Sequence, residues 1–145
     1  MDPIIIEAET GAIQLGARDR LLPWESLAAV EPRVAHLLRH RKDFGTGYEW
    51  LYLQDLSFGG QPASLALCFA HRRLEMANVS VSLPGARDGW PGAEEIEAEV
   101  AFVRETLRGM VGFNPAKANK AFAWGSVWSE YDPKGDLASS GLRYT

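Results

Sequence analysis

The sequence predicts an α+β fold, in which an antiparallel β-sheet of about six or seven strands carries two helices on one face. Short runs with alternating apolar and polar residues, each bounded by glycine- or proline-containing turns, are typical of antiparallel strands. Two longer stretches have apolar residues at helical spacing and divide the strands into groups, in the order ββ-α-βββ-α-ββ. Because short turns join neighbouring strands, this order places the helices together on one side.

A β-hairpin begins the chain, since residues 4–9 and 12–15 are extended runs on either side of a Thr-Gly break. A helical stretch follows from Pro23, a residue that a first helical turn tolerates. Its apolar residues at helical spacing are Leu27, Val30, Val34, Leu37 and Leu38. Pro32 interrupts this pattern, so we expect two short helices or one bent helix. The basic run at residues 39–42 is expected at the helix C-terminus, where the dipole favours cations.

Three strands are predicted in the middle of the chain. Residues 48–58 alternate, with Leu51 and Leu53 on one face and Trp50 and Tyr52 on the other. Residues 64–70 form a nearly continuous apolar run, which is typical of a central strand, and residues 74–83 form the third strand. The apolar positions of this third strand change face, which predicts a β-bulge near Ala77 and Asn78.

The longest helix is predicted at residues 93–110. Its apolar stripe consists of Ile96, Val100, Val103, Leu107 and Met110. Four glutamates crowd its N-terminal half and two arginines lie near its end, so both ends suit the helix dipole. Gly109 and Gly112 are expected to terminate it.

The last quarter of the chain predicts a closing β-hairpin. Residues 122–131 form one alternating strand, residues 132–135 (Asp-Pro-Lys-Gly) fit a type I turn, and residues 139–144 return. Alternation places Trp124 and Trp128 on one face, which we expect to cover the stripe of the long helix. The alternative is that the hairpin tip, with Tyr131 and Asp132, presents an aromatic and acidic surface to a partner.

Composition narrows the class of protein. The 145 residues suit a single domain, residues 1–145, and 46% of them are hydrophobic. The net charge of −4 argues against nucleic acid as a partner. Cys68, the one cysteine, lies in an apolar run and is expected to be a buried, inert thiol in a reducing compartment. Neither a secretory signal nor a membrane-spanning run is predicted, so we expect a cytoplasmic protein.

No motif predicts a catalytic, metal or cofactor site. His36 and His40 have the i, i+4 spacing of a helical metal pair, but a third ligand is missing and neighbouring cations would repel a metal ion. The Gly-x-Gly at residues 45–47 lacks the third glycine of a dinucleotide fingerprint. We therefore expect a non-enzymatic protein without cofactors.

Two features are candidates for binding a protein partner. The glutamates of the long helix are either a solvated helix start or an acidic patch for a basic partner. The closing hairpin supplies the aromatic component. Together the predicted partner-binding residues are Glu94, Glu95, Glu97, Glu99, Trp124, Trp128, Tyr131 and Asp132.

The C-terminal pattern also resembles a known type of protein. Phe122-x-Trp124-Gly125-x-Val127-x-Ser129-x-Tyr131-Asp132-Pro133-Lys134-Gly135, ending in Gly141-Leu142-Arg143-Tyr144, resembles the end of small cytoplasmic immunity proteins. Such proteins neutralise polymorphic toxins that competing bacteria deliver by type VI secretion or contact-dependent inhibition. The resemblance implies a stoichiometric inhibitor that occludes a cognate toxin domain. An acidic inhibitor suits a basic toxin, because complementary charge speeds association.

Two alternatives remain open. One is a small enzyme or ligand-binding protein whose pocket lies between sheet and helices and holds a histidine. The other is a structural or adaptor protein that forms a homodimer through a sheet edge.

Overall fold

The computed structural model describes residues 1–85, 92–132, 134 and 137–145. Within these residues the chain forms ten strands and two α-helices, so the predicted α+β class is confirmed with more strands than expected. The strands are β1 (Asp2–Ile6), β2 (Ile13–Leu15), β3 (Asp19–Leu21), β4 (Leu38–Asp43), β5 (Tyr48–Phe58), β6 (Gln61–Ala70), β7 (Arg73–Val81), β8 (Asn119–Phe122), β9 (Gly125–Asp132) and β10 (Leu137–Tyr144). The helical elements are α1 (Leu27–Val34), a 3-10 turn η1 (Ala35–Leu37) and α2 (Ala93–Val111).

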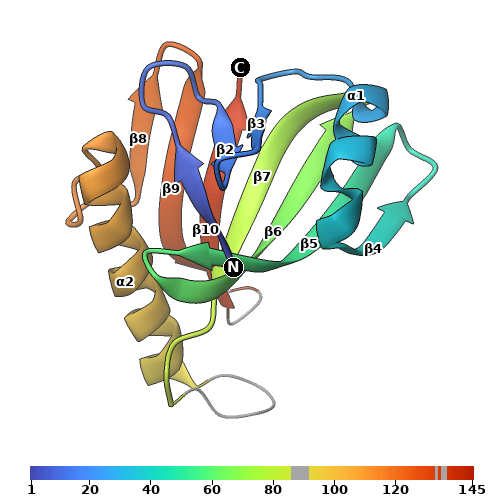
Figure 1. Ribbon diagram of the computed structural model, residues 1–145. Helices are drawn as coiled ribbons and strands as arrows, with labels where there is room; N and C mark the ends of the chain where they lie inside the picture. Colours follow the sequence, from blue (N-terminus) through green and yellow to red (C-terminus); the bar gives the residue numbers. More distant parts are fainter. Residues whose placement is uncertain (86–91, 133, 135–136) are drawn as a thin grey trace.

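The strands pair in the order β3-β2-β1-β5-β6-β7-β10-β9-β8. Strand β4 pairs with the first half of β5, whereas β1 pairs with its end, so two strands share one edge of β5. The β1–β5 contact is parallel, and the other pairs are antiparallel. Strands β4–β10 form the main sheet, and Figure 1 shows α1, α2 and the β1–β3 segment together on one side of it.

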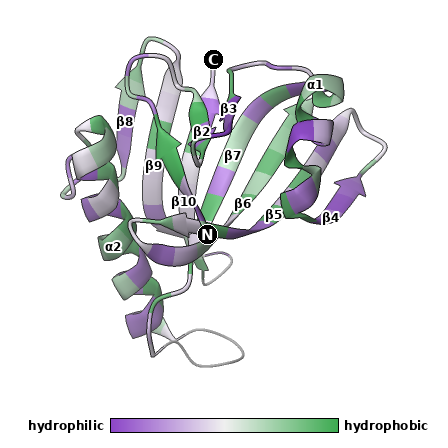
Figure 2. Ribbon diagram, viewed as in Figure 1, coloured by the Kyte–Doolittle hydropathy of each residue, from purple (hydrophilic) through white to green (hydrophobic). Residues whose placement is uncertain are grey.

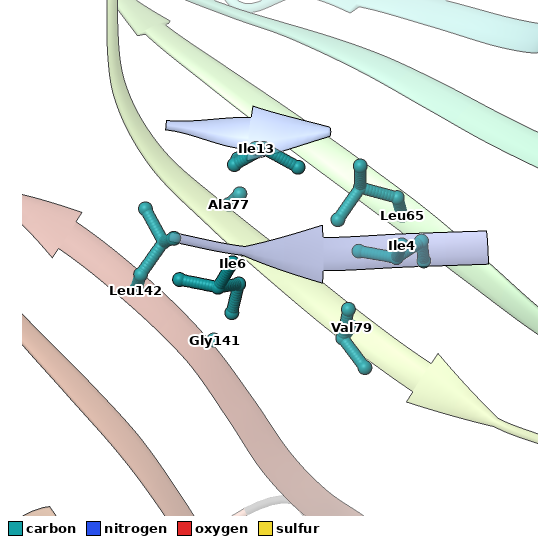
Figure 3. Close-up of a pocket in the computed structure, with 8 residues that line it drawn as sticks. All are labelled: Ile4, Ile6, Ile13, Leu65, Ala77, Val79, Gly141 and Leu142. Carbon is teal, nitrogen blue, oxygen red and sulfur yellow. The ribbon is translucent and has the colours of Figure 1, made fainter. Parts of the chain in front are cut away.

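The β1–β2 hairpin fills the space over the middle of the main sheet. Ile4, Ile6 and Ile13 point toward side chains of β6, β7 and β10 (Figure 3). The void left between them has a volume of about 10 Å³ and an apolar lining, so it is too small and too apolar to hold a water molecule. Burying each isoleucine contributes about 1.5–3 kcal/mol, and the hairpin therefore seals this part of the core.

Helix α1 is shorter than the sequence predicts. The Ser26 hydroxyl accepts from the Ala29 N–H and caps the helix. Pro32 lies inside the helix, which ends at Val34 and continues as the 3-10 turn η1. The basic run at residues 39–42 lies in strand β4 instead of at a helix end. The condition for His36 and His40 to share a helical face, one continuous helix, is therefore not met, since one lies in the 3-10 turn and the other in the strand.

The β-bulges also differ from the expectation. Cys68 pairs with Met76 and Phe69 with Leu74, so the extra residue of β7 is Glu75 and not a residue near Ala77 and Asn78. A second bulge, at Asp55 of β5, has a φ of 62°. It shifts the alternation by one residue, which returns Leu56 and Phe58 to the core.

Helix α2 follows the prediction closely. Its buried residues are Ile96, Val100, Val103, Leu107 and Val111. Gly112 ends the helix in the left-handed conformation, with a φ of 71°, and its N–H donates to the Arg108 carbonyl. Gly109 lies inside the helix, so the prediction that it helps to terminate α2 is wrong. Neither helix of the described chain has the length and apolar content that crossing a membrane requires.

The predicted closing hairpin is present as β9 and β10, which pair from Gly125–Tyr144 to Asp132–Leu137. Its predicted turn includes Pro133 and Gly135, which lie outside the described residues. The single strand predicted at residues 122–131 is wrong, because β8 and β9 form a tight hairpin in which Phe122 pairs with Gly125. Gly125 has a φ of 154° and a Cβ there would come within 2.0 Å of the Arg143 carbonyl oxygen, so glycine permits this reversal.

Candidate binding face

The eight residues predicted to bind a partner lie in three separate places. Trp124 belongs to the core: it packs against the buried cluster, and its Nε1–H donates to the Ala8 carbonyl at 2.8 Å. Its ring stacks on Phe122 and meets the edge of Tyr144, at centroid distances of 4.8 and 5.9 Å. The β8–β9 turn thus removes Trp124 from the face that it was expected to share with Trp128.

A second group gathers around the N-terminal half of α2. Glu94 and Glu97 are exposed, whereas Glu99 is half-buried and its carboxylate accepts the Val81 N–H at 3.2 Å. Burial raises the pKa of Glu99. Glu95 is half-buried. Glu99 therefore stabilises the end of β7, and the exposed glutamates remain available to a partner.

Tyr131 and Asp132 lie at the end of β9 and point to opposite faces of the sheet, so Asp132 shares the side of Trp128. Tyr131 pairs with Ala138. It points to the same side of β9 as the buried Val127 and Ser129, which is the α2 side of the sheet. The Asp132 carboxylate accepts a hydrogen bond from the Lys134 N–H at 3.0 Å.

We name the exposed carboxylates on the α2 side, Glu94 and Glu97, the acidic end.

Trp128 occupies the third place, on the opposite side of the main sheet. We define this side as the outer face, because α1, α2 and the β1–β3 segment all lie on the other side (Figure 1). Cross-strand pairing identifies one row of outer residues that runs across the whole sheet: His40, Tyr52, Ala66, Asn78, Gly141, Trp128 and Asn119. The next row consists of Lys42, Trp50, Cys68, Met76, Arg143, Ser126 and Ala121.

The outer face carries aromatic side chains near both of its edges and smaller side chains at its centre. On β5, Trp50 stacks on Tyr52 at a centroid distance of 6.1 Å, and Tyr52 meets His40 of β4 at 5.4 Å. On β9, the Trp128 Nε1–H donates to the Ser139 hydroxyl at 3.0 Å, which fixes the indole on the sheet. Ala66 and Asn78 lie between these aromatic groups, so the centre of the face is lower than its sides.

Besides an open depression of about 450 Å³ beside Arg39, His40 and Tyr52, two hollows result from this arrangement. The first, of about 330 Å³, has Trp50, Tyr52 and Arg39 on one side and Ala66 and Asn78 on the other. The second, of about 270 Å³, is lined by Met76, Asn119, Ser126, Trp128, Ser139 and Arg143. Both are open to solvent and shallow, which suits the side chains of a protein partner better than an enclosed small ligand.

Charged groups on the outer face differ in sign from those of the acidic end. Strand β4 is mostly hydrophilic (Figure 2) and contributes Arg39 and Lys42 beside the aromatic rings. Arg143 reaches over Met76, with its Nη2 3.3 Å from the sulfur. This face also carries carboxylates: Glu130 and Asp132 lie on the same side of β9 as Trp128, and Glu75 lies near Cys68.

Two polar groups on the outer face are shielded from water. The Oδ1 atom of Asn78 is buried and accepts no hydrogen bond from the described residues. The thiol of Cys68 is also buried, and desolvation, followed by the nearby Glu75 carboxylate, raises its pKa to about 11. A thiol in this state is a poor nucleophile, which agrees with the expected inert cysteine.

Alternation in residues 48–58 predicts that Trp50 and Tyr52 lie on the face opposite Leu51 and Leu53, but it assigns them to no site. The available signal was the pair of aromatics on the polar side of an amphipathic strand. The sequence does not predict a place for Arg39 and His40 on this face, because the polar run that forms β4 resembles a basic helix end. Asn78 and Arg143 carry no sequence signal, since only the strand order brings them together.

Comparison with known proteins identifies the fold. No family model matches the chain, and no curated protein matches it in sequence. Its structure is similar to a chain of a solved complex, that of Rhs1-CT with its cognate immunity protein RhsI1, with a TM-score of 0.52. The similarity covers 97% of this chain and 86% of the other, at 12% sequence identity. The resemblance to immunity proteins of polymorphic toxin systems is thus confirmed at the level of the fold, which this chain shares with a component of a toxin–immunity complex.

Proposed function

We propose that this protein binds and neutralises a bacterial toxin domain by occlusion, as a non-catalytic immunity-type protein in the cytoplasm. The observation that supports this most is the shared fold with a chain of the Rhs1-CT–RhsI1 complex along nearly the whole chain. The resemblance of the C-terminal residues to immunity proteins points the same way and does not depend on the fold.

The exposed surface also favours a protein partner. The outer face combines tryptophan, tyrosine, methionine and arginine, the residue types that supply most binding energy in protein interfaces. The apolar void under the β1–β2 hairpin, of about 10 Å³, leaves no room for a substrate at that place. A protein that acts by occlusion needs a broad contact surface, and the outer face supplies one.

Net charge favours a basic toxin. The chain carries a formal charge of −4, and Glu94 and Glu97 expose two carboxylates at the acidic end. Opposite net charges attract over about a Debye length and raise the association rate without requiring contact between the charged groups. We therefore propose that the acidic end assists the encounter with the toxin.

Co-expression with the toxin domain encoded by the neighbouring gene tests the proposal. We expect a 1:1 complex in calorimetry, growth of cells that otherwise die, and an association rate that falls as salt rises. A non-cognate toxin domain is the control and is expected to remain unbound and lethal. Failure both to bind the cognate domain and to protect cells would refute the proposed function.

A further inference from the structure

We propose that the toxin domain docks on the outer face of the sheet, and that its docking segment carries carboxylates and an N–H or O–H donor. This inference rests on the proposed function and deepens it by choosing one of two opposite surfaces. The acidic end then contributes to the encounter, and the outer face makes the contacts.

The residue types distinguish the two surfaces. Trp50, Tyr52 and Trp128 lie on the outer face, each half-buried, with Met76 and Arg143 between them. Their side chains are held before any partner arrives, by ring stacking on β5 and by the hydrogen bond from Trp128 to Ser139. Pre-positioned aromatic groups lose little conformational entropy on binding.

The shape of the outer face suits protruding side chains. Hollows of about 330 and 270 Å³ lie on the two sides of the central strands, each with a tryptophan at its margin. Two side chains of a partner segment that crosses the strands would enter them, while the segment itself lies over Ala66 and Asn78. Contacts of this kind, in which anchors enter pockets beside tryptophan, carry most of the free energy of association.

Local charge indicates the chemistry of the docking segment. Although the chain is acidic, Arg39 and Lys42 lie beside the first hollow and Arg143 lines the second. Guanidinium groups bind carboxylates in a bidentate manner. A segment with one carboxylate at each hollow would complement both margins, whereas a basic segment would meet like charges.

Asn78 supplies a separate observation. Its side chain lines the first hollow, and its buried Oδ1 atom has no donor among the described residues. An unsatisfied buried oxygen is costly, and a donor from a partner removes that cost. Mutation of Asn78 is therefore expected to affect the free protein and the complex in opposite directions, which a purely structural asparagine would not do.

The test measures association and dissociation of the cognate toxin domain with purified variants. Arg39→Glu and Arg143→Glu are expected to weaken binding about tenfold each, mainly through faster dissociation. Trp50→Ala is expected to weaken it about 30-fold. Asn78→Ala is expected to weaken binding about tenfold while the melting temperature of the free protein stays the same or rises.

Matched controls lie on the other side of the sheet. Arg18→Glu changes an exposed arginine in the turn between β2 and β3, in the segment that lies on the helix side of the sheet, and it is expected to leave dissociation unchanged. Glu94→Lys with Glu97→Lys is expected to slow association at low salt and to leave the dissociation rate unchanged. Melting temperatures of all variants verify that each is folded, and the arginine variants keep the test valid if Trp50→Ala is unstable.

The outcomes separate this inference from the proposed function. If wild type binds the toxin, outer-face variants dissociate normally and the glutamate variants dissociate quickly, the acidic end is the docking surface and the inference is wrong. If wild type does not bind at all, both proposals fail. The inference would also be wrong if the free wild-type protein sediments as a dimer and the Trp50→Ala variant as a monomer. Binding of single-stranded RNA that is lost in Trp50→Ala would overturn it as well.

Discussion

At the scale of single residues, Cys68 reports on how tightly the outer face is packed. Its thiol lies under Trp50 and Met76, its neighbours in the cross-strand row, and is 2% exposed. Burial raises its pKa from 9.0 to about 11, so at pH 8 roughly one thiol in a thousand is ionised in the folded protein.

We expect a thiol reagent at pH 8 to modify Cys68 about a hundred times more slowly in the folded protein than in urea. Because the raised pKa belongs to the folded state, its contribution to stability is complete below pH 9 and is lost between pH 9 and about pH 11. The absorbance of the thiolate that the reagent releases measures the rate of Cys68 modification, and no other cysteine contributes because the chain has one. Equal rates in both states would contradict a buried thiol.

At the scale of elements, Arg104 connects α2 to the closing hairpin. Its Nε–H donates to the Ser129 carbonyl at 2.9 Å, and its Nη1 donates to the Pro115 carbonyl at 3.2 Å. Arg108, one turn later, pairs with the exposed Glu105 of the same helix. Arg104 therefore connects α2 to β9, whereas Arg108 makes a contact within α2.

Arg104→Ala is expected to lower the free energy of unfolding by about 1.5–3 kcal/mol, because hydrogen bonds from a charged donor are lost. Arg108→Ala is the matched control and is expected to have little effect, since exposed ion pairs contribute little. Urea denaturation monitored by circular dichroism measures both. A similar midpoint for the two variants would show that Arg104 does not hold the helix to β9.

Elements with long, regular patterns were predictable from the sequence, and those that depend on tertiary contacts were not. The stripe of α2 and the alternation of β5 identify both elements because one face of each is buried. Strand β4 was missed since its residues are nearly all polar: Arg41 is held by Glu31 and Glu49, at 2.6 and 3.0 Å, and not by apolar burial. The β8–β9 turn was missed because Trp124 and Gly125 continue an alternating pattern.

The candidate site was less predictable than the fold. Alternation placed Trp128 correctly relative to Val127, but which side of the sheet the helices cover is decided by the whole structure. As a result, Trp128 was assigned to the helix side and Trp50 was not considered. Of the predicted binding residues, Trp124 is in the core, and the role of the others in binding a toxin stays a prediction.

At the scale of the whole molecule, the first and last segments are joined. The Tyr144 hydroxyl donates to the Gly11 carbonyl at 2.6 Å in a buried position, and burial raises the pKa of Tyr144. Trp124 makes the similar bond to Ala8. The turn of the N-terminal hairpin is thereby fixed to β8–β10 at the far end of the chain.

Tyr144→Phe is expected to cost about 1–3 kcal/mol, because the buried Gly11 carbonyl loses its donor. Tyr48→Phe, with a tyrosine that is 43% exposed, is the control and is expected to be nearly neutral. Hydrogen exchange is expected to quicken in both β1–β2 and β9–β10 of the Tyr144 variant. Exchange that quickens in only one of them would show that the two segments open separately.

The position of the N-terminal hairpin has a consequence for the time at which the protein becomes functional. Ile4, Ile6 and Ile13 leave the ribosome early, but part of the surface that buries them, including Leu142, is made more than a hundred residues later. At a synthesis rate of roughly 5–20 residues per second, β10, which covers part of the hairpin, is made several seconds after it. Such distant pairing slows folding. The core over β1 and β2 is therefore complete only once β10 has been made, and a chain that stops before Leu142 is expected to leave these isoleucines partly uncovered.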